Sequence, residues 1–331
     1  MERSAALDFS RFAAALVVFS GHLFFVPNSM NWSDSTILFL NPIRTGDTAV
    51  LFFFALSGYV LSLGTRKEYY FGWVVSRIVR LFPIYICAWF LGFLLVVLHK
   101  SELISPKVVL LGVIGFQSLD PEVMLYVNAP LWSLSVEIVV AFFLIYLLKL
   151  KSRPILLFAC LIFALVFWMN FSWSPILRAL PFFLLGILIS NEKVRSLYPH
   201  SRVSLLIIFV GGVFYIFRGA TWLVDLPGDI ASDMYKLFLV SFLIFLLSRI
   251  EISKKLAKYA IACGKRSFSL YAFHYPILLA MNYFIQPATL LSFAIYAILS
   301  LIGTFACTEF AYRFIDHPSI AASKRVKGWF F

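Results

Sequence analysis

Residues 78–98 read IVRLFPIYICAWFLGFLLVVL, and Arg80 is the only charged residue among them. A helix needs about 20 apolar residues to cross a hydrocarbon core near 30 Å. Ten apolar segments of this kind can be placed along the chain, at residues 9–27, 47–64, 78–98, 131–148, 154–170, 176–190, 203–218, 234–249, 268–285 and 289–312. The sequence therefore predicts an all-α integral membrane protein with about ten transmembrane helices.

The composition supports a membrane location for most of the chain. Hydrophobic residues make up 62% of it and charged residues only 13%, whereas soluble domains carry about 45–50% apolar and about 25% charged residues. The net charge of +12 could indicate nucleic acid. Because Lys and Arg lie in short loops between apolar segments, membrane orientation explains the charge better, and no nucleic-acid partner is expected.

The orientation follows from the distribution of Lys and Arg. With a cytoplasmic N-terminus, most of them fall inside, and the outer side keeps Arg44, Lys100, Lys107, Arg178, Arg218 and Lys236. This asymmetry predicts that both termini are cytoplasmic. Residues 106–118 are apolar but too short to span, so we expect a re-entrant or interfacial piece on the outer side. Several spans are short, which favours a central polar cavity between helices.

One face of the first predicted helix combines Arg11 and His22. The two residues are eleven positions apart, which is close to three helical turns and about 16 Å along the axis. An ionisable group at membrane depth costs roughly 2.5–3.5 kcal/mol, so a functional role for His22 is favoured. The alternative is a structural histidine bonded to a backbone carbonyl.

Glu137 lies early in the predicted helix 131–148, at a depth similar to that of His22. A carboxylate there should be paired or protonated, and the His22 imidazole is a natural partner. An ion pair between Glu137 and Arg178 is an equally weighted alternative.

Three further sets of polar residues lie near the predicted membrane spans. Arg77 and Arg80 share a helix face and suit phosphate, although ordinary anchoring on the cytoplasmic side would also explain them. Tyr271 and His274, in the inner half of their predicted helix, could line a polar channel or bond a carbonyl freed by Pro276. Ser57-Gly58 is a small-residue patch that is typical of close helix packing.

Six short sequence blocks, in this order along nearly the whole chain, resemble motifs of the membrane-bound acyltransferase-3 family. The blocks are Arg11 with His22 (Arg-X10-His), residues 53–59 (FFALSGY), 77–83 (RIVRLFP), 131–137 (LWSLSVE), 269–276 (SLYAFHYP) and 312–318 (YRFIDHP). Two positions depart from the family pattern: Leu51 stands where some members carry an acid, and Asp316 replaces the usual Glu. The resemblance implies a single transmembrane domain over residues 1–331, of the stand-alone kind without an appended soluble domain.

The resemblance also implies a reaction, in which an acyl group, usually acetyl, passes from acetyl-CoA to a hydroxyl of a glycan or similar acceptor. His22 is then the expected general base, with Glu137 orienting its ring, or the nucleophile of an acetyl-histidine intermediate. The expected CoA-binding residues are Arg11, Arg77, Arg80, Ser57, Tyr271 and His274. We expect the acceptor near Trp132 and Arg178, and no metal.

Analogy with the family suggests a multi-pass protein of the bacterial inner membrane that modifies a polysaccharide, such as O-antigen, or its lipid-linked precursor. The expected partners are therefore acyl-CoA, the glycan acceptor and membrane lipid, with a homodimer left open. The rival hypothesis is a transporter or flippase, which would use the same buried polar groups as a substrate path. The residues alone do not identify the acyl group or the acceptor.

Overall fold

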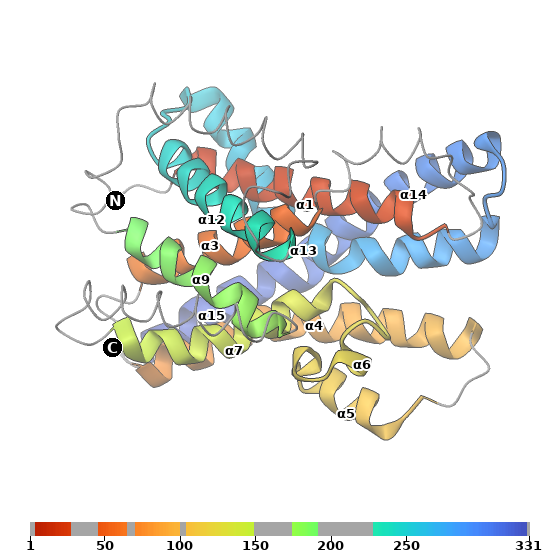
Figure 1. Ribbon diagram of the computed structural model, residues 1–331, viewed down its shortest axis with the longest axis horizontal. Coiled ribbons are helices and arrows are strands. Elements are labelled where there is room, and N and C mark those ends of the chain that lie inside the picture. The colour runs from red at the N-terminus through yellow and green to blue at the C-terminus, as the bar shows by residue number, and fades with distance from the viewer. Residues whose placement is uncertain are drawn as a thin grey trace. The chain divides into compact units, whose positions relative to one another are not determined.

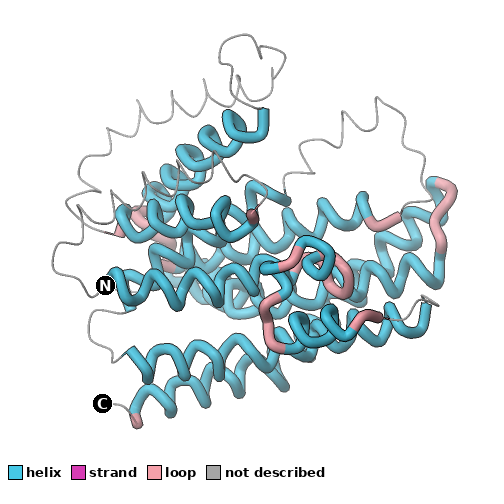
Figure 2. The backbone as a smooth tube through the Cα atoms, turned by 60° about the horizontal axis from the view of Figure 1, so that its bottom comes forward, coloured by secondary structure: helices cyan, strands magenta, loops and turns pink. Residues whose placement is uncertain are grey.

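The structure is a computed structural model that describes residues 4–27, 46–64, 70–99, 104–148, 174–190 and 228–329. Within these ranges every regular element is helical and none is a strand (Figure 2). The chain divides into two compact units. The first contains Met1–Val50, Glu68–Val139 and Glu251–Phe331, and the second contains Leu51–Lys67 and Val140–Ile250.

The described elements follow one another along the chain as labelled in Figure 1. In order they are α1 (Ala5–Phe25), α3 (Gly46–Gly64), α4 (Tyr70–His99), α5 (Pro106–Val113), the 3₁₀ turn η2 (Gln117–Leu119), α6 (Pro121–Met124), α7 (Leu131–Leu148), α9 (Pro175–Ile189), α12 (Gly228–Leu247), α13 (Lys254–Ile285), α14 (Leu290–Ala311), the π-helical turn η4 (Tyr312–Asp316) and α15 (His317–Gly328).

Eight of the ten predicted apolar segments coincide with helices, namely α1, α3, α4, α7, α9, α12, α13 and α14. The segments 154–170 and 203–218 lie outside the described residues. Within the described part of the chain, four helical stretches are both long and apolar enough to cross a membrane: Ala5–Phe25, Gly46–Leu63, Gly72–His99 and Leu290–Val326. The expected short outer piece at 106–118 forms α5 and the start of η2, and α5 has only 8 residues.

In the first unit, α1 packs along α13, and α14 returns along α13 after a tight turn. The turn ends α13 at Gln286, which adopts a left-handed conformation with φ of 46°, and Thr289 with Ser292 then caps α14 reciprocally. Such a capping box satisfies backbone N–H groups that a helix start leaves unpaired. The first unit is therefore built around a three-helix group that carries the site described below.

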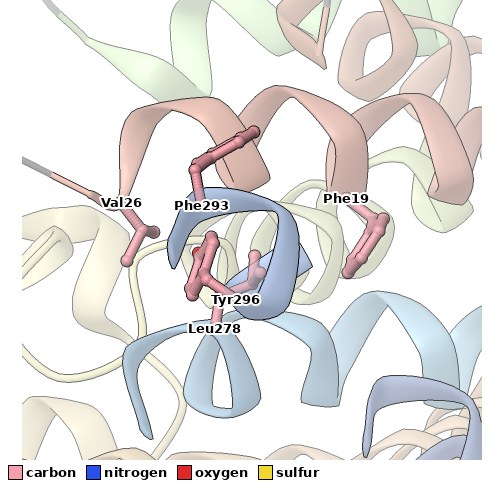
Figure 3. Packing of buried hydrophobic residues seen from close by; sticks show 5 residues of the cluster. All are labelled: Phe19, Val26, Leu278, Phe293 and Tyr296. Carbon is pink, nitrogen blue, oxygen red and sulfur yellow. The ribbon is translucent and has the colours of Figure 1, made fainter. Parts of the chain in front are cut away.

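An apolar cluster joins these three helices. Phe19 of α1, Val26 just after α1, Leu278 of α13, and Phe293 and Tyr296 of α14 bury their side chains against one another (Figure 3). His22 lies between Phe19 and Val26 in sequence, so this cluster fixes the turn of α1 that carries the imidazole.

The second unit depends on two glycines for close contact between helices. A Cβ atom on Gly58 of α3 would lie 2.9 Å from the backbone carbonyl carbon of Phe183 in α9, and one on Gly186 of α9 would lie 2.9 Å from the backbone nitrogen of Tyr59. Only glycine permits such an approach, because it has no Cβ. The close packing predicted for Ser57-Gly58 is thus confirmed for Gly58.

Candidate active site

Two histidines from distant parts of the sequence meet inside the first unit. His22 Nδ1 of α1 lies 3.0 Å from His274 Nε2 of α13, and the two ring centroids are 5.2 Å apart. His274 is completely buried, whereas His22 is half-buried. The sequence placed His274 in the inner half of its helix and His22 in the outer part of the first helix. The structure brings the two residues to one level, because α1 and α13 run in parallel with Gly264 against Asp8 and His274 against His22.

A backbone carbonyl fixes the tautomers of both rings. His274 Nδ1 lies 2.7 Å from the carbonyl oxygen of Tyr271, which can only accept a hydrogen bond. His274 Nδ1 therefore carries a proton, and in the neutral ring its Nε2 is an acceptor. The hydrogen bond to this Nε2 must then come from His22 Nδ1–H. The neutral His22 ring carries one proton, so its Nε2 is then the unprotonated nitrogen, which can accept a proton or attack a carbonyl. His22 also makes a backbone hydrogen bond with Val18, as the structural alternative expected.

Aromatic side chains hold the two rings in place. Phe19 packs edge-on against His274 at a centroid distance of 6.4 Å, and Tyr275 packs edge-on against His22 at 5.3 Å. These contacts leave each imidazole little rotational freedom. A base with a fixed ring and a fixed tautomer is what general base catalysis requires.

Glu137 has a different partner from the one predicted. Its Oε1 accepts a hydrogen bond from Arg77 Nη2 of α4 at 2.5 Å, and Arg77 also lies over the Trp73 ring at 5.4 Å. The prediction that Glu137 orients the His22 ring is therefore wrong, since His274 takes that position. The alternative ion pair between Glu137 and Arg178 joins residues of the two different units and stays a prediction.

Ser133 and Tyr271 connect the glutamate region to the histidines. The two hydroxyls are 2.7 Å apart, and the Tyr271 hydroxyl also donates to the carbonyl oxygen of Pro130 at 3.1 Å. Ser133 lies one helical turn before Glu137 on α7, and Glu137 is close enough to Tyr271 for an electrostatic interaction. Tyr271 does not bond the carbonyl freed by Pro276, as one alternative held; it bonds the segment that leads into α7.

The three predicted phosphate-binding arginines each face an acid. Arg11 lies 3.7 Å from Asp8 on α1, and Arg77 pairs with Glu137. Arg80 interacts electrostatically with Asp316, Arg77 and Arg11. Asp316 is buried in the π-helical turn η4, which packs against α4, while Arg80 is exposed. Arg11 and Arg77 are thus within electrostatic range of Arg80, beside acids that the sequence did not assign to them. The predicted role of the three arginines in binding CoA phosphates stays a prediction.

Arg178, expected on the acceptor side, belongs to an ion cluster in the second unit. It forms a bidentate pair with Asp233 of α12, with 2.8 Å between Nη2 and Oδ1, and Lys236 approaches the same carboxylate at 3.0 Å. Ser57 lies half-buried beside Gly58 in the same unit, and Trp132 lies half-buried in the first turn of α7. The roles predicted for these residues in acceptor or CoA binding stay predictions.

Sequence reasoning missed Asn128, which is fully buried just before α7. Its side-chain amide donates to the backbone carbonyls of Ala88 in α4 and Ala272 in α13, at 3.2 Å each. One signal could have found it: Pro276 has no N–H to offer the carbonyl of Ala272, four residues earlier, so some other donor is needed.

The fold and the site define an all-helical membrane protein with a histidine pair suited to acid–base or nucleophilic chemistry. A family model described as an acyltransferase domain matches residues 4–309. The chain therefore belongs to the acyltransferase-3 family of membrane acyltransferases, which transfer acyl groups to hydroxyls. No curated protein and no solved structure matches the chain.

Proposed function

We propose that the protein is an O-acyltransferase that moves acetyl, or another short acyl group, from cytoplasmic acyl-CoA to a hydroxyl of a cell-surface glycan or its lipid-linked precursor. The observation that carries the proposal is the His22–His274 pair, in which His22 Nε2 is unprotonated on a half-buried ring. Membership of the acyltransferase-3 family supports the reaction class.

In the proposed reaction, His22 Nε2 takes the proton from the acceptor hydroxyl. The resulting oxygen nucleophile forms a bond to the thioester carbonyl carbon, and the carbon–sulfur bond breaks. CoA leaves as a thiolate and takes the proton back from His22. His274 Nε2 accepts the Nδ1–H of His22 throughout and so stabilises the transient imidazolium, as the third member of a catalytic triad does.

A two-step route uses the same atoms. His22 Nε2 would attack the thioester carbonyl carbon, and the carbon–sulfur bond would break to release the CoA thiolate. The acceptor oxygen would then bond to the acyl carbon, the bond from this carbon to Nε2 would break, and the hydroxyl proton would pass to the thiolate. In this route His274 would orient the attacking nitrogen, and its bond to Nδ1–H would again stabilise the positive charge on the acylated ring. Both routes depend on His22 and His274, so substitution of His22 tests both of them.

CoA would enter from the cytoplasmic side with its phosphates toward Arg11, Arg77 and Arg80. Each arginine faces a carboxylate, but a guanidinium has five N–H donors and can bind a phosphate while keeping that partner. The distance of about 16 Å between Arg11 and His22 along α1 leaves room for an extended pantetheine arm. Trp132 and Arg178 remain the proposed acceptor-side residues.

The test is acyl transfer by the purified protein in vesicles, with radiolabelled acetyl-CoA and a membrane glycan extract, for wild type and His22→Ala. We expect His22→Ala to lose at least about 100-fold in kcat, because a positioned base contributes about 10²–10⁴-fold. His99→Ala is the matched control, since His99 is exposed at the end of α4. Equal transfer by His22→Ala and wild type would discard the mechanism.

Mass spectrometry of surface glycans from cells with and without the gene would identify the product. It gives the mass of the added group and the sugar that bears it. Unchanged glycans together with driven uptake of a small molecule would favour the transporter hypothesis instead.

A further inference from the structure

The carbonyl of Ala272 has lost its normal helical partner. In an α-helix this carbonyl accepts from the N–H of the residue four positions later, which here is Pro276, and proline has no N–H. Both residues lie within the helix α13 (Lys254–Ile285). In the interior of a membrane protein a freed carbonyl must find a donor from a neighbouring element.

Asn128 supplies that donor. Its Nδ2 lies 3.2 Å from the carbonyl oxygen of Ala272 and 3.2 Å from that of Ala88 in α4, and the residue is completely buried. Gly92 of α4 makes the approach possible, because a Cβ there would lie 2.8 Å from the carbonyl oxygen of Val127. One side chain thus ties α4 to α13 at the break in α13.

Residues 128–133, which we call the outer strap, bind the same turn of α13 at two more points. The Tyr271 hydroxyl donates to the Pro130 carbonyl at 3.1 Å and lies 2.7 Å from the Ser133 hydroxyl. The strap is itself anchored through Gln117, whose side-chain amide donates to the carbonyl of Asn128 at 3.5 Å. The strap therefore contacts Tyr271 and Ala272, which come just before Phe273 and His274 in α13.

His274 lies inside the helical turn that Pro276 leaves open. The missing hydrogen bond would have joined residues 272 and 276, and His274 is midway between them. A helix that lacks this bond can bend at that turn, and any bend there moves the His274 ring relative to His22. The bond between their rings is only 3.0 Å long, so a small displacement would break it.

We infer that Asn128 is a positioning residue that closes the proline break in α13 and thereby holds His274 against His22. This inference rests on the proposed function, because it assigns Asn128 to the support of the proposed catalytic pair. It also assigns a task to the outer strap: the segment that precedes α7 sets the geometry of a histidine more than 140 residues away.

A double-mutant cycle tests the inference, since Pro276→Ala restores the N–H that Asn128 replaces. In the wild-type background, Asn128→Ala should lower kcat about tenfold, as expected for one buried hydrogen bond, with the KM for acyl-CoA changed by less than about twofold. In the Pro276→Ala background, Asn128→Ala should change kcat by less than about twofold. Coupling of this kind between contacting groups is what such a cycle measures.

Ser269→Ala is the matched control on the same helix. Ser269 is fully buried, and among the described residues its hydroxyl has no hydrogen-bond partner, so its loss should leave kcat within about twofold. An equal loss of kcat from Asn128→Ala in both backgrounds, or no loss in either, overturns the inference.

The thermal unfolding temperature of the four cycle proteins separates this inference from the proposed function. If the wild type transfers acyl groups and the cycle shows no coupling in kcat, the positioning role fails while the proposed function stands. If the wild type transfers nothing to any acceptor but the unfolding temperatures are coupled, the proposed function fails and the catalytic role of Asn128 falls with it.

Discussion

At the scale of single residues, the tautomer of His274 decides which atom of His22 is available for chemistry. His274 donates its Nδ1–H to the carbonyl of Tyr271 and accepts at Nε2 from His22 Nδ1–H, which leaves His22 Nε2 unprotonated in the neutral ring. His22 bonded only to a backbone carbonyl would orient the same ring, but it would not gain a second imidazole to stabilise positive charge. The pair is therefore better suited to catalysis than to structure.

Substitution of His274 tests this assignment with two side chains of different chemistry. His274→Leu removes the acceptor for His22 Nδ1–H, so we expect kcat to fall by at least about 100-fold. His274→Gln can present an amide oxygen to the same N–H and should recover part of that loss. Both variants should be assayed for acyl transfer and for expression level in membranes. A His274→Leu protein as active as wild type would contradict the assignment.

At the scale of elements, the short helices α5 and α6 are joined by a surface ion cluster. Lys107 of α5 pairs with Asp120, which also caps α6 by accepting from the N–H groups of Glu122 and Val123, at 2.9 and 3.3 Å. The Lys107 ammonium is the main cause that holds the pKa of Asp120 below its usual range, and Asp120 raises the pKa of Lys107 in return. This cluster lies ahead of the outer strap in sequence.

The lowered pKa of Asp120 predicts how the outer helices respond to acid. A carboxyl with a depressed folded pKa stabilises the fold above its unfolded pKa of about 3.9, and the stabilisation is lost as pH falls through the folded value. The protection factors of the Glu122 and Val123 amides, which correct the exchange rates for their intrinsic pH dependence, should therefore stay constant down to about pH 4 and fall below it.

Asp120→Asn provides the control for this pH dependence. Asparagine also caps helices, so the backbone bonds should remain, whereas the titration should disappear. Protection that falls with acid equally in the variant and in wild type would contradict a role for the Asp120 carboxylate.

At the scale of the whole molecule, the sequence predicted helices well and contacts poorly. Apolar segments such as 78–98 predict helices because lipid admits almost no other structure. The contact between His22 and His274 depends on the register of two helices some 250 residues apart, which no local pattern encodes. No local pattern encodes the pair Arg77–Glu137 either. The sequence shows which residues are charged, but three acids and three arginines allow many pairings.

The length of α13 also bears on how the whole protein crosses the membrane. It has 32 residues, or about 48 Å at 1.5 Å per residue, which exceeds a hydrocarbon core of about 30 Å. Its first turns carry exposed Lys254, Lys255 and Lys258, so we expect them to extend into the cytoplasm. The exposed residue Glu122 of α6 should then face the opposite side.

Cysteine labelling in intact cells tests this orientation directly. In a background in which Cys87, Cys160, Cys263 and Cys307 are replaced by Ser or Ala, Glu122→Cys should react with a membrane-impermeant maleimide added from outside. Lys255→Cys should react only after the membrane that holds the protein is permeabilised, because a charged reagent does not cross lipid. Reaction of Lys255→Cys in intact cells would invert the orientation, and acyl-CoA from the cytoplasm could then no longer reach Arg11, Arg77 and Arg80 from the side that the proposed function requires.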